Sequence, residues 1–388
     1  MPDKPVSDHS KSILIFTDWY VPGYKAGGPI QSVYNLANVL SRKHIVRVVC
    51  SDRDLNSTDA YAGITCNVWI ELAEQHYVMY LNREGSSFKN IKQIVKLNQN
   101  NILYINGLYS LKFSLFPALL ASYYNIKKCF ISVRGMLHQS ALSVKPIKKQ
   151  VFLAFARGFG LYSKSVLLAS GTRETEEIRR ALGKVQIRLA PNIPMLPDSI
   201  SNPERQNKCK PDETSFLFLG RIAPEKNPVS VLQALKIAET PCYVTFCGTA
   251  AEGPYFSEFQ KEMSELPPFV VVKYIQDLPH EQIPSLLVEH DVMILPSLGE
   301  NFGHAIFESF VHAVPVIIGN NTPWAGIHEH HAGIETNPMD VTAIAEAIRR
   351  FAEMGGSEYS QWSAGARKMA MQYFEANNFE ELYTKLFS

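Results

Sequence analysis

Short apolar runs alternate with amphipathic stretches along most of the chain, and the runs end in polar or glycine-containing turns. In the stretches between the runs, apolar residues recur every three or four positions, as on one face of a helix. Strands that alternate with helices at this spacing form a parallel, doubly wound sheet. The apolar runs of the first half are SILIFT (12–17), IVRVVC (45–50), ILYI (102–105), FISV (130–133), VLLA (166–169) and QIRLA (186–190).

The same alternation begins again in the second half of the chain. Between the halves, residues 191–214 are rich in Pro, Asn, Ser and charge without periodicity, which is typical of a linker. A chain of 388 residues is long enough for two domains. We therefore expect an α/β protein with an N-terminal domain over residues 1–195, a C-terminal domain over 196–370 and a final segment, 371–388. The apolar runs of the second half lie at 216–219, 243–247, 270–275 and 292–295.

The stretch MILPSLGENFGHAIFESFVHAVPVIIG (293–319) predicts a strand, a turn, a helix and a second strand. Glu300 lies in the turn and Glu308 in the helix. Strand-to-helix turns of parallel sheets bind ligands, and the NH groups at a helix start favour anions. Carboxylates suit hydroxyl groups, so the inferred ligand is both phosphorylated and polyhydroxylated. The alternative is that Glu300 is a solvated loop acid and Glu308 an exposed helix residue.

A second strand end lies upstream, in FLFLGRIAPEKNPVSVLQAL (216–235). The apolar run ends at Gly220 and is followed by Arg221 and Lys226, and Pro228 stands at a favourable first-turn position of a helix. Two cations at a strand end suit a diphosphate. The only acid evident nearby in the sequence is Glu225.

The two motifs, G-R-x-x-x-E-K-N and P-S-x-x-E-x-F-G-x-x-x-x-E-x(6)-PVI, together resemble the donor half of the retaining family 4 glycosyltransferases. The resemblance covers residues 216–335 well and the rest more loosely. It implies the GT-B fold, in which two Rossmann-like domains with doubly wound parallel sheets face a central cleft. It also implies that the final segment crosses back as a helix onto the N-terminal domain.

The resemblance assigns roles to residues of the C-terminal domain. Arg221 and Lys226 would neutralise the diphosphate as it becomes a leaving group. Glu300 would hold hydroxyls of the donor sugar, and Glu308 those of the ribose. The other donor-binding residues that it implies in this domain are Gly248, Asn301, Phe302 and Gly303.

The N-terminal domain supplies further candidates. Gly27 and Gly28 resemble the glycine loop that lies under the donor phosphates. Asn106 is near a site that a histidine occupies in many relatives, which makes it a candidate acceptor-lining residue. Arg134 stands where relatives have a cleft histidine; it suits a phosphate or carboxylate but cannot act as a base, and the alternative is a structural ion pair. His138 either replaces the missing imidazole or is solvated.

Composition narrows the function further. The 38 Lys and Arg nearly cancel the 37 Asp and Glu, which argues against nucleic acid as a partner. Six cysteines without C-x-x-C spacing indicate reduced thiols. The N-terminal sequence is no secretion signal and the apolar stretches are too short to span a bilayer, so we expect a soluble, cytoplasmic protein, with peripheral contact at the inner face of the membrane left open. His328, His330 and His331 are too close along a loop to converge on one ion.

On this resemblance we expect a retaining, hexosyltransferase-type glycosyltransferase. It would move a sugar from a nucleotide-diphosphate-sugar to a saccharide or lipid-linked acceptor, in surface polysaccharide biosynthesis. The nucleotide-sugar is a substrate, and no cofactor or metal is implied because the cations and the helix start supply the positive charge. Two alternatives stay open: a nucleotide-sugar epimerase or hydrolase on the same scaffold, and a nucleotide-sugar-binding protein without activity.

Overall fold

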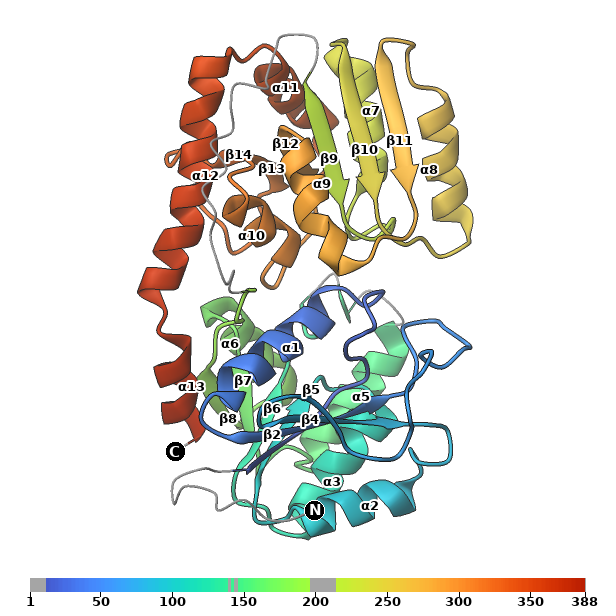
Figure 1. Cartoon of the computed structure of the whole chain (residues 1–388), viewed down its shortest axis with the longest axis vertical. Coiled ribbons are helices and arrows are strands. Elements are labelled where there is room, and N and C mark those ends of the chain that lie inside the picture. Colours follow the sequence, from blue (N-terminus) through green and yellow to red (C-terminus); the bar gives the residue numbers. More distant parts are fainter. Residues whose placement is uncertain (1–11, 139–140, 143–145, 196–213, 388) are drawn as a thin grey trace. The chain divides into compact units, whose positions relative to one another are not determined.

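The computed structural model describes residues 12–138, 141–142, 146–195 and 214–387 (Figure 1). The chain divides into two compact units, each with its own sheet. Unit 1 comprises Met1–Met195 and Asn378–Ser388, and unit 2 comprises Leu196–Asn377. Most of the predicted linker, 191–214, lies outside the described residues.

The described part of unit 1 contains an eight-stranded sheet in the order β3-β4-β2-β1-β5-β6-β7-β8. Neighbouring strands are parallel, except that β3 and β4 are antiparallel. The strands are β1 (Ser12–Phe16), β2 (Ile45–Ser51), β3 (Ile70–Ala73), β4 (His76–Leu81), β5 (Ile102–Asn106), β6 (Cys129–Ser132), β7 (Val166–Ala169) and β8 (Gln186–Leu189). The helices are α1 (Gly28–Ser41), α2 (Phe88–Leu97), the π-helical turn η1 (Leu111–Leu115), α3 (Phe116–Tyr123), α5 (Pro146–Gly158), α6 (Thr172–Leu182) and α13 (Phe379–Phe387).

Unit 2 contains a six-stranded, parallel sheet in its described part, in the order β11-β10-β9-β12-β13-β14. The strands are β9 (Ser215–Leu219), β10 (Cys242–Cys247), β11 (Val270–Ile275), β12 (Val292–Leu295), β13 (Val316–Gly319) and β14 (Gly333–Thr336). The helices are α7 (Pro228–Ala238), α8 (Pro254–Ser264), the 3-10 turn η2 (His280–Gln282), α9 (Ile283–Glu289), α10 (His304–Val311), α11 (Val341–Ala352) and α12 (Gly356–Ala376). The predicted doubly wound α/β architecture is confirmed.

Each sheet has a point where the direction of winding reverses. In unit 1 this point lies between β1 and β5, and in unit 2 it lies between β9 and β12. Ligands of open parallel sheets bind outside the carboxyl ends of the strands at such a point, because the connections diverge there and leave a crevice. Both sequence motifs of the second half follow strands that flank this point in unit 2.

The last helix, α13, belongs to unit 1 although it comes last in the chain. It packs beside α1 (Figure 1). The Phe387 ring lies 5.0 Å from that of Phe130 and 6.4 Å from that of Tyr104, and is 1% exposed. The Tyr383 hydroxyl donates to the carbonyl of Pro191 at 2.9 Å. The C-terminal residues therefore complete the core of unit 1.

We expect Phe387→Ala to lower the free energy of unfolding of unit 1 by about 3 kcal/mol, because the substitution leaves a cavity against Tyr104 and Phe130. Denaturant unfolding measures this change. The control is Phe159→Ala, at a side chain that is 77% exposed, where we expect a change within about 0.5 kcal/mol. Equal effects of the two substitutions would show that α13 contributes no core.

Candidate functional site

The reversal point of unit 2 brings together the cation of one motif and the carboxylate of the other. Lys226 Nζ donates to Glu300 Oε1 at 2.5 Å, and Ser297 Oγ donates to the same oxygen at 2.7 Å. The side chains of Lys226 and Glu300 are 21% and 10% exposed. The interpretation of Glu300 as a solvated loop acid is therefore wrong, and so is the expectation that Glu225 is the only acid near the cations.

Arg221 occupies a different environment from Lys226. Its guanidinium pairs with Glu225 at 2.5 Å, and the two side chains are 48% and 31% exposed. The backbone N–H of Leu298 donates to the carbonyl of Glu225 at 3.0 Å, so the loops after β9 and β12 are tied together. An exposed ion pair contributes little to stability, so Arg221 can exchange Glu225 for an anionic ligand at small cost.

Glu308 is buried in α10, with 8% of its surface exposed. The alternative interpretation as an exposed helix residue is wrong. Its Oε1 lies 3.0 Å from Nε2 of His280, in the loop between β11 and α9. Gly303, just before α10, has φ +79°, and a Cβ there would lie 2.8 Å from Ile306 Cδ1. Glycine is therefore required at the turn that leads into the helix.

His280 received no role from the sequence motifs, although its position after a strand of unit 2 could have marked it. Burial by itself lowers the pKa of His280, but the hydrogen bond and the charge of Glu308, with a smaller effect of Glu281, outweigh it. The pKa of His280 is therefore raised above its ordinary value. The histidine and Glu308 form a charged pair when His280 is protonated.

Glu300 and Glu308 each bind protein partners through only one of their two carboxylate oxygens within the described residues. Glu300 and Glu308 each use Oε1 for protein partners. Within the described ranges, the second oxygen of each accepts no hydrogen bond from the protein. Each carboxylate is thus held in position by one oxygen and can accept a hydroxyl group with the other.

The other predicted donor-binding residues of unit 2 lie in the same loops. A Cβ at Gly248 would lie 2.0 Å from the carbonyl oxygen of Gly220, so glycine is needed where the ends of β9 and β10 approach. Phe302 is 6% exposed and packs against Trp324, whose Nε1 donates to the carbonyl of Phe302. Its side chain therefore belongs to the core. Asn301 lies half-buried between Glu300 and Phe302.

Unit 1 brings Arg134 and Asn106 together. Arg134 Nε donates to Asn106 Oδ1 at 3.1 Å and Nη2 donates to the Tyr104 hydroxyl at 3.0 Å. In the part of the chain that the structure describes, no carboxylate lies within ion-pair distance of Arg134. The alternative of a structural ion pair is therefore wrong. Glu174 accepts from the N–H of Gly135 with one oxygen and from the N–H of Ser170 with the other.

His138 faces α6, where its Nε2 lies 2.5 Å from Arg173 Nη2 and 4.0 Å from Glu177 Oε1. Its proposed replacement of a cleft imidazole gains no support from these partners. Gly27 precedes α1 with φ +62°, and no atom lies within 4 Å of where its Cβ would be. The backbone at Gly27 therefore borders open space in unit 1, and Gly28 is the first residue of α1.

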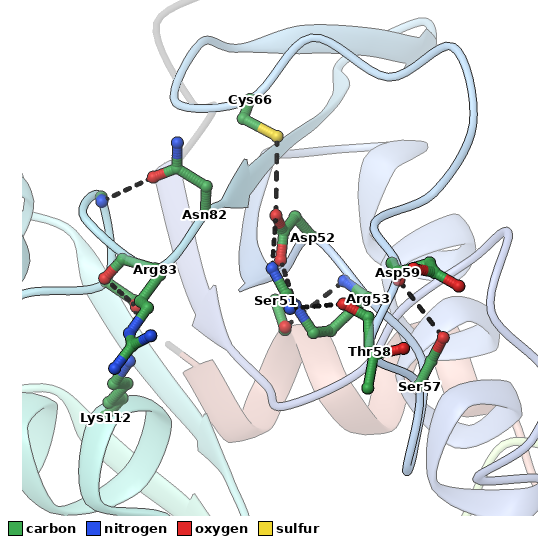
Figure 2. A network of polar contacts seen from close by, with 12 residues as sticks. Ser51, Asp52, Arg53, Ser57, Thr58, Asp59, Cys66, Asn82, Arg83 and Lys112 are labelled. Carbon is green, nitrogen blue, oxygen red and sulfur yellow. Dashed lines mark hydrogen bonds and ion pairs between the residues drawn. The ribbon is translucent and has the colours of Figure 1, made fainter.

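Two aspartates spaced as D-x-D follow β2, a spacing often associated with metal sites. Asp52 accepts from Arg53 Nε at 2.9 Å and from the Cys66 thiol at 3.9 Å (Figure 2). Asp54 accepts from the N–H groups of Tyr24 and Lys25 at 2.7 and 3.0 Å. The protein thus already engages both carboxylates. No group of three or more His, Cys, Asp or Glu side chains suited to a metal ion occurs among the described residues.

The described helices include none with the length and apolar character needed to cross a membrane. The histidines of the 328–331 loop include two that pack against Trp362: His328 and His331, with ring centroids 5.5 and 5.4 Å away. This contact accounts for their proximity without an ion.

Residues 200–369 match the family model described as "Glycosyl transferases group 1", and this range covers most of unit 2. An uncharacterized 41.2 kDa protein in the cps region of Klebsiella pneumoniae is 22% identical over 304 residues, 76% of this chain and 80% of that protein. The putative teichuronic acid biosynthesis glycosyltransferase TuaC of Bacillus subtilis is 27% identical over 225 residues, 55% of this chain and 54% of TuaC.

Solved structures resemble the whole chain. The sucrose-phosphate synthase of Thermosynechococcus elongatus superposes with a TM-score of 0.71 at 16% identity, over 97% of this chain and 99% of that one. Anabaena HepE in complex with UDP-glucose gives a TM-score of 0.71 at 17% identity with the same coverage. The chain therefore has the GT-B fold of two-domain glycosyltransferases. The family match falls on the unit that contains Lys226, Glu300 and Glu308.

We expect His280→Gln to make the protein less stable, and more so at pH 6 than at pH 9. Because the folded-state pKa of His280 is raised, its contribution is complete below the unfolded pKa of roughly 6.5 and is lost as the pH rises through the folded-state value. The loss at pH 6 should be roughly 1 kcal/mol or more, the scale of a hydrogen bond to a charged group.

Urea unfolding at the two pH values measures the difference. His330→Gln, at an exposed histidine of the same unit, is the control and should show no such pH dependence. The same loss at pH 6 and pH 9 would contradict a charged pair between His280 and Glu308.

Proposed function

We propose that the protein is a retaining, hexosyltransferase-type glycosyltransferase that uses a nucleotide-diphosphate-sugar. The donor binds to unit 2, and the acceptor is a saccharide or a lipid-linked saccharide. The observation that carries the proposal is the pair of buried carboxylates, Glu300 and Glu308, each with one oxygen held by the protein and one available for a hydroxyl group. Lys226 pairs with Glu300 at the reversal point of the sheet, and Arg221 lies in the same loop as Lys226.

This arrangement suits the parts of a nucleotide-sugar. Lys226, with Arg221 once it leaves Glu225, neutralises the diphosphate, and the N–H groups at the start of α10 add a favourable dipole. Glu300 accepts from sugar hydroxyls and Glu308 from the ribose. Charge-assisted hydrogen bonds contribute roughly 1.5–3 kcal/mol each, and they become stronger as the leaving group gains charge.

The retaining outcome is supported by what Glu300 is placed to do. An inverting displacement needs a carboxylate or imidazole that takes a proton from the acceptor. Glu300 Oε1 already accepts from Lys226 and Ser297, which suits holding the sugar rather than removing a proton. The names of the Klebsiella and Bacillus relatives, from a cps region and from teichuronic acid biosynthesis, support a role in making surface polysaccharide.

The test is the release of nucleoside diphosphate from a panel of nucleotide-sugars, with and without sugar and lipid-linked acceptors. We expect release to require an acceptor and to persist in EDTA, and we expect the product to keep the anomeric configuration of the donor. Release without any acceptor would indicate an epimerase or hydrolase. Binding without release would indicate a binding protein, and an absolute need for manganese or magnesium would overturn the metal-free mechanism.

We expect the double substitution Arg221→Ala, Lys226→Ala to weaken binding of the nucleoside diphosphate at least about tenfold, because two contacts worth roughly 1.5 kcal/mol or more each are lost. Titration calorimetry measures the affinity. Lys226→Ala alone should also lower the unfolding free energy, because it leaves a carboxylate that is 10% exposed without its cation. Lys236→Ala, which breaks a pair with Glu262 away from this site, is the control. Unchanged affinity of the double variant would contradict the donor assignment.

The proposal includes peripheral contact with an anionic membrane through α5 and Phe159, the residue that follows it. Ile147, Val151, Phe155 and Phe159 follow each other at four-residue spacing and are between 54% and 77% exposed. Residues 85–172 contain no aspartate or glutamate but twelve lysines and arginines. An apolar stripe on a basic helix fits an anionic bilayer surface, where apolar side chains insert between headgroups that attract the cations.

We expect the protein to co-sediment with phosphatidylglycerol vesicles, less with phosphatidylcholine vesicles, and less at high salt. Phe155→Ser should weaken the binding at least about tenfold, since an inserted phenylalanine contributes about 1.5–3 kcal/mol. Met339→Ser, at a residue of unit 2 that is 75% exposed, should leave it unchanged. Equal binding to the two lipids, or equal effects of the two substitutions, would contradict this surface.

A further inference from the structure

Unit 1 has a polar site of its own at the reversal point between β1 and β5. Asp18 follows β1, Asn106 ends β5, and Arg134 follows β6 by one residue. These three strands are neighbours in a parallel sheet, so their carboxyl ends meet at one edge. Asn106 Nδ2 donates to Thr17 Oγ1 at 3.3 Å, and Ser110 Oγ donates to Asp18 Oδ1 at 2.5 Å. We call this set the Arg134 subsite.

The guanidinium of Arg134 is fixed by neutral partners only. Asn106 and the Tyr104 hydroxyl orient Nε and Nη2, and in the described ranges Nη1 has no hydrogen-bond partner and no acid pairs with the side chain. Arg134 is half-buried. A partly desolvated guanidinium without a counter-ion is unfavourable unless an anion completes it. The subsite is therefore prepared for a negatively charged group.

The backbone around Arg134 is held in place at some cost. Arg134 has φ +54°, a conformation that L residues rarely adopt. The turn is secured by Glu174, which is 4% exposed and accepts from the N–H of Gly135 and from Ser170. Strain that the surroundings maintain is typical of residues that contact a ligand. Glu174 thereby acts as a positioning residue for Arg134.

Arg53, which follows the neighbouring strand β2, has a guanidinium that the protein itself satisfies. Its Nε and Nη2 donate to the two oxygens of Asp52, and Nη1 donates to the carbonyl of Thr58 (Figure 2). All three nitrogens of that guanidinium are satisfied by the protein. Arg134 differs from Arg53 in that its Nη1 has no hydrogen-bond partner and no acid pairs with it among the described residues.

The charge around Arg134 favours an anion as well. From residue 85 to residue 172 the chain has no acid, so the acids near Arg134 come from other segments. Glu174 is engaged by Gly135 and Ser170, and Asp18 is the acid that follows β1. Burial raises the pKa of its carboxyl group, and the hydrogen bond from Ser110 lowers it in part. Asp18 Oδ2 accepts no hydrogen bond among the described residues and can take a sugar hydroxyl.

We infer that the Arg134 subsite binds an acceptor that carries an oxyanion, with Arg134 on the charged group and Asp18 and Asn106 on neighbouring hydroxyls. The oxyanion is either the carboxylate of an acidic sugar or the phosphate of a phosphate-linked sugar. Both match the planar fork of an arginine. The inference rests on the proposed glycosyl transfer and adds the charge of the acceptor to it.

The test compares sugar ligands that carry a carboxylate, a phosphate or no charge. Methyl glucuronoside, methyl glucoside and glucose 1-phosphate are titrated in calorimetry against the full-length protein without donor. They are then used as acceptors in the nucleotide-release assay. The variants are Arg134→Gln, which removes the charge, and Arg134→Lys, which keeps the charge but loses the fork. Arg53→Gln is the matched control at the end of β2.

We expect the anionic ligands to bind at least tenfold more tightly than methyl glucoside. Arg134→Gln should abolish this preference, Arg134→Lys should keep part of it, and Arg53→Gln should leave it intact. Affinity for nucleoside diphosphate, which reports on unit 2 and on folding, should stay within twofold in all variants. The anionic ligand that binds more tightly identifies the acceptor as an acidic sugar or as a phosphate-linked sugar.

Equal binding of charged and neutral ligands, or a preference that survives in Arg134→Gln, would overturn the inference. Anion binding without any nucleotide release would leave the subsite standing and refute the transferase function. Nucleotide release that depends only on neutral acceptors would refute the Arg134 subsite and leave the transferase function standing.

Discussion

The ion pair between Lys226 and Glu300 joins the two loops on which the candidate site of unit 2 depends. The residues are 74 positions apart and meet only because β9 and β12 are adjacent in the sheet. With Glu300 10% exposed, the pair contributes little net stability, since desolvation offsets much of the attraction. Its consequence is geometric: it fixes a carboxylate and a cation side by side, where a diphosphate and a sugar would need them.

Glu308 is paired with His280 in the same way as Glu300 is paired with Lys226. In each case one carboxylate oxygen is used for positioning, and the other is left for a ligand within the described residues. Unit 1 differs because its central cation, Arg134, is oriented by an amide and a hydroxyl and forms no ion pair among the described residues. We therefore propose that unit 2 mainly recognises hydroxyl groups and that unit 1 recognises the oxyanion of an acceptor.

Much of the fold followed from the sequence, because buried parallel strands are continuous apolar runs and their order along the chain alternates with helices. The placement of Arg221 and Lys226 in the loop after β9, and of Glu300 and Glu308 in the loop and helix after β12, also followed from two motifs. The hydrogen-bond partners of these residues did not follow from the sequence. The pairs Lys226 with Glu300, Glu308 with His280, and Gly135 with Glu174 are contacts between separate elements. Periodicity specifies which residues face inward but carries no information on strand order, which decides these pairs. The D-x-D aspartates show that a spacing typical of metal sites can have another role. Arg53 and backbone N–H groups donate hydrogen bonds to their carboxylates.

The central claim is that a nucleotide-sugar binds where the loops after β9 and β12 meet. Hydrogen–deuterium exchange, measured with and without a nucleotide-diphosphate-sugar, tests it most directly, because ligand contact slows the exchange of the amides that it covers. The account predicts protection of the amides of residues 220–226 and 297–304, and of the segment around His280. Saturating ligand that leaves these three segments unprotected would contradict it.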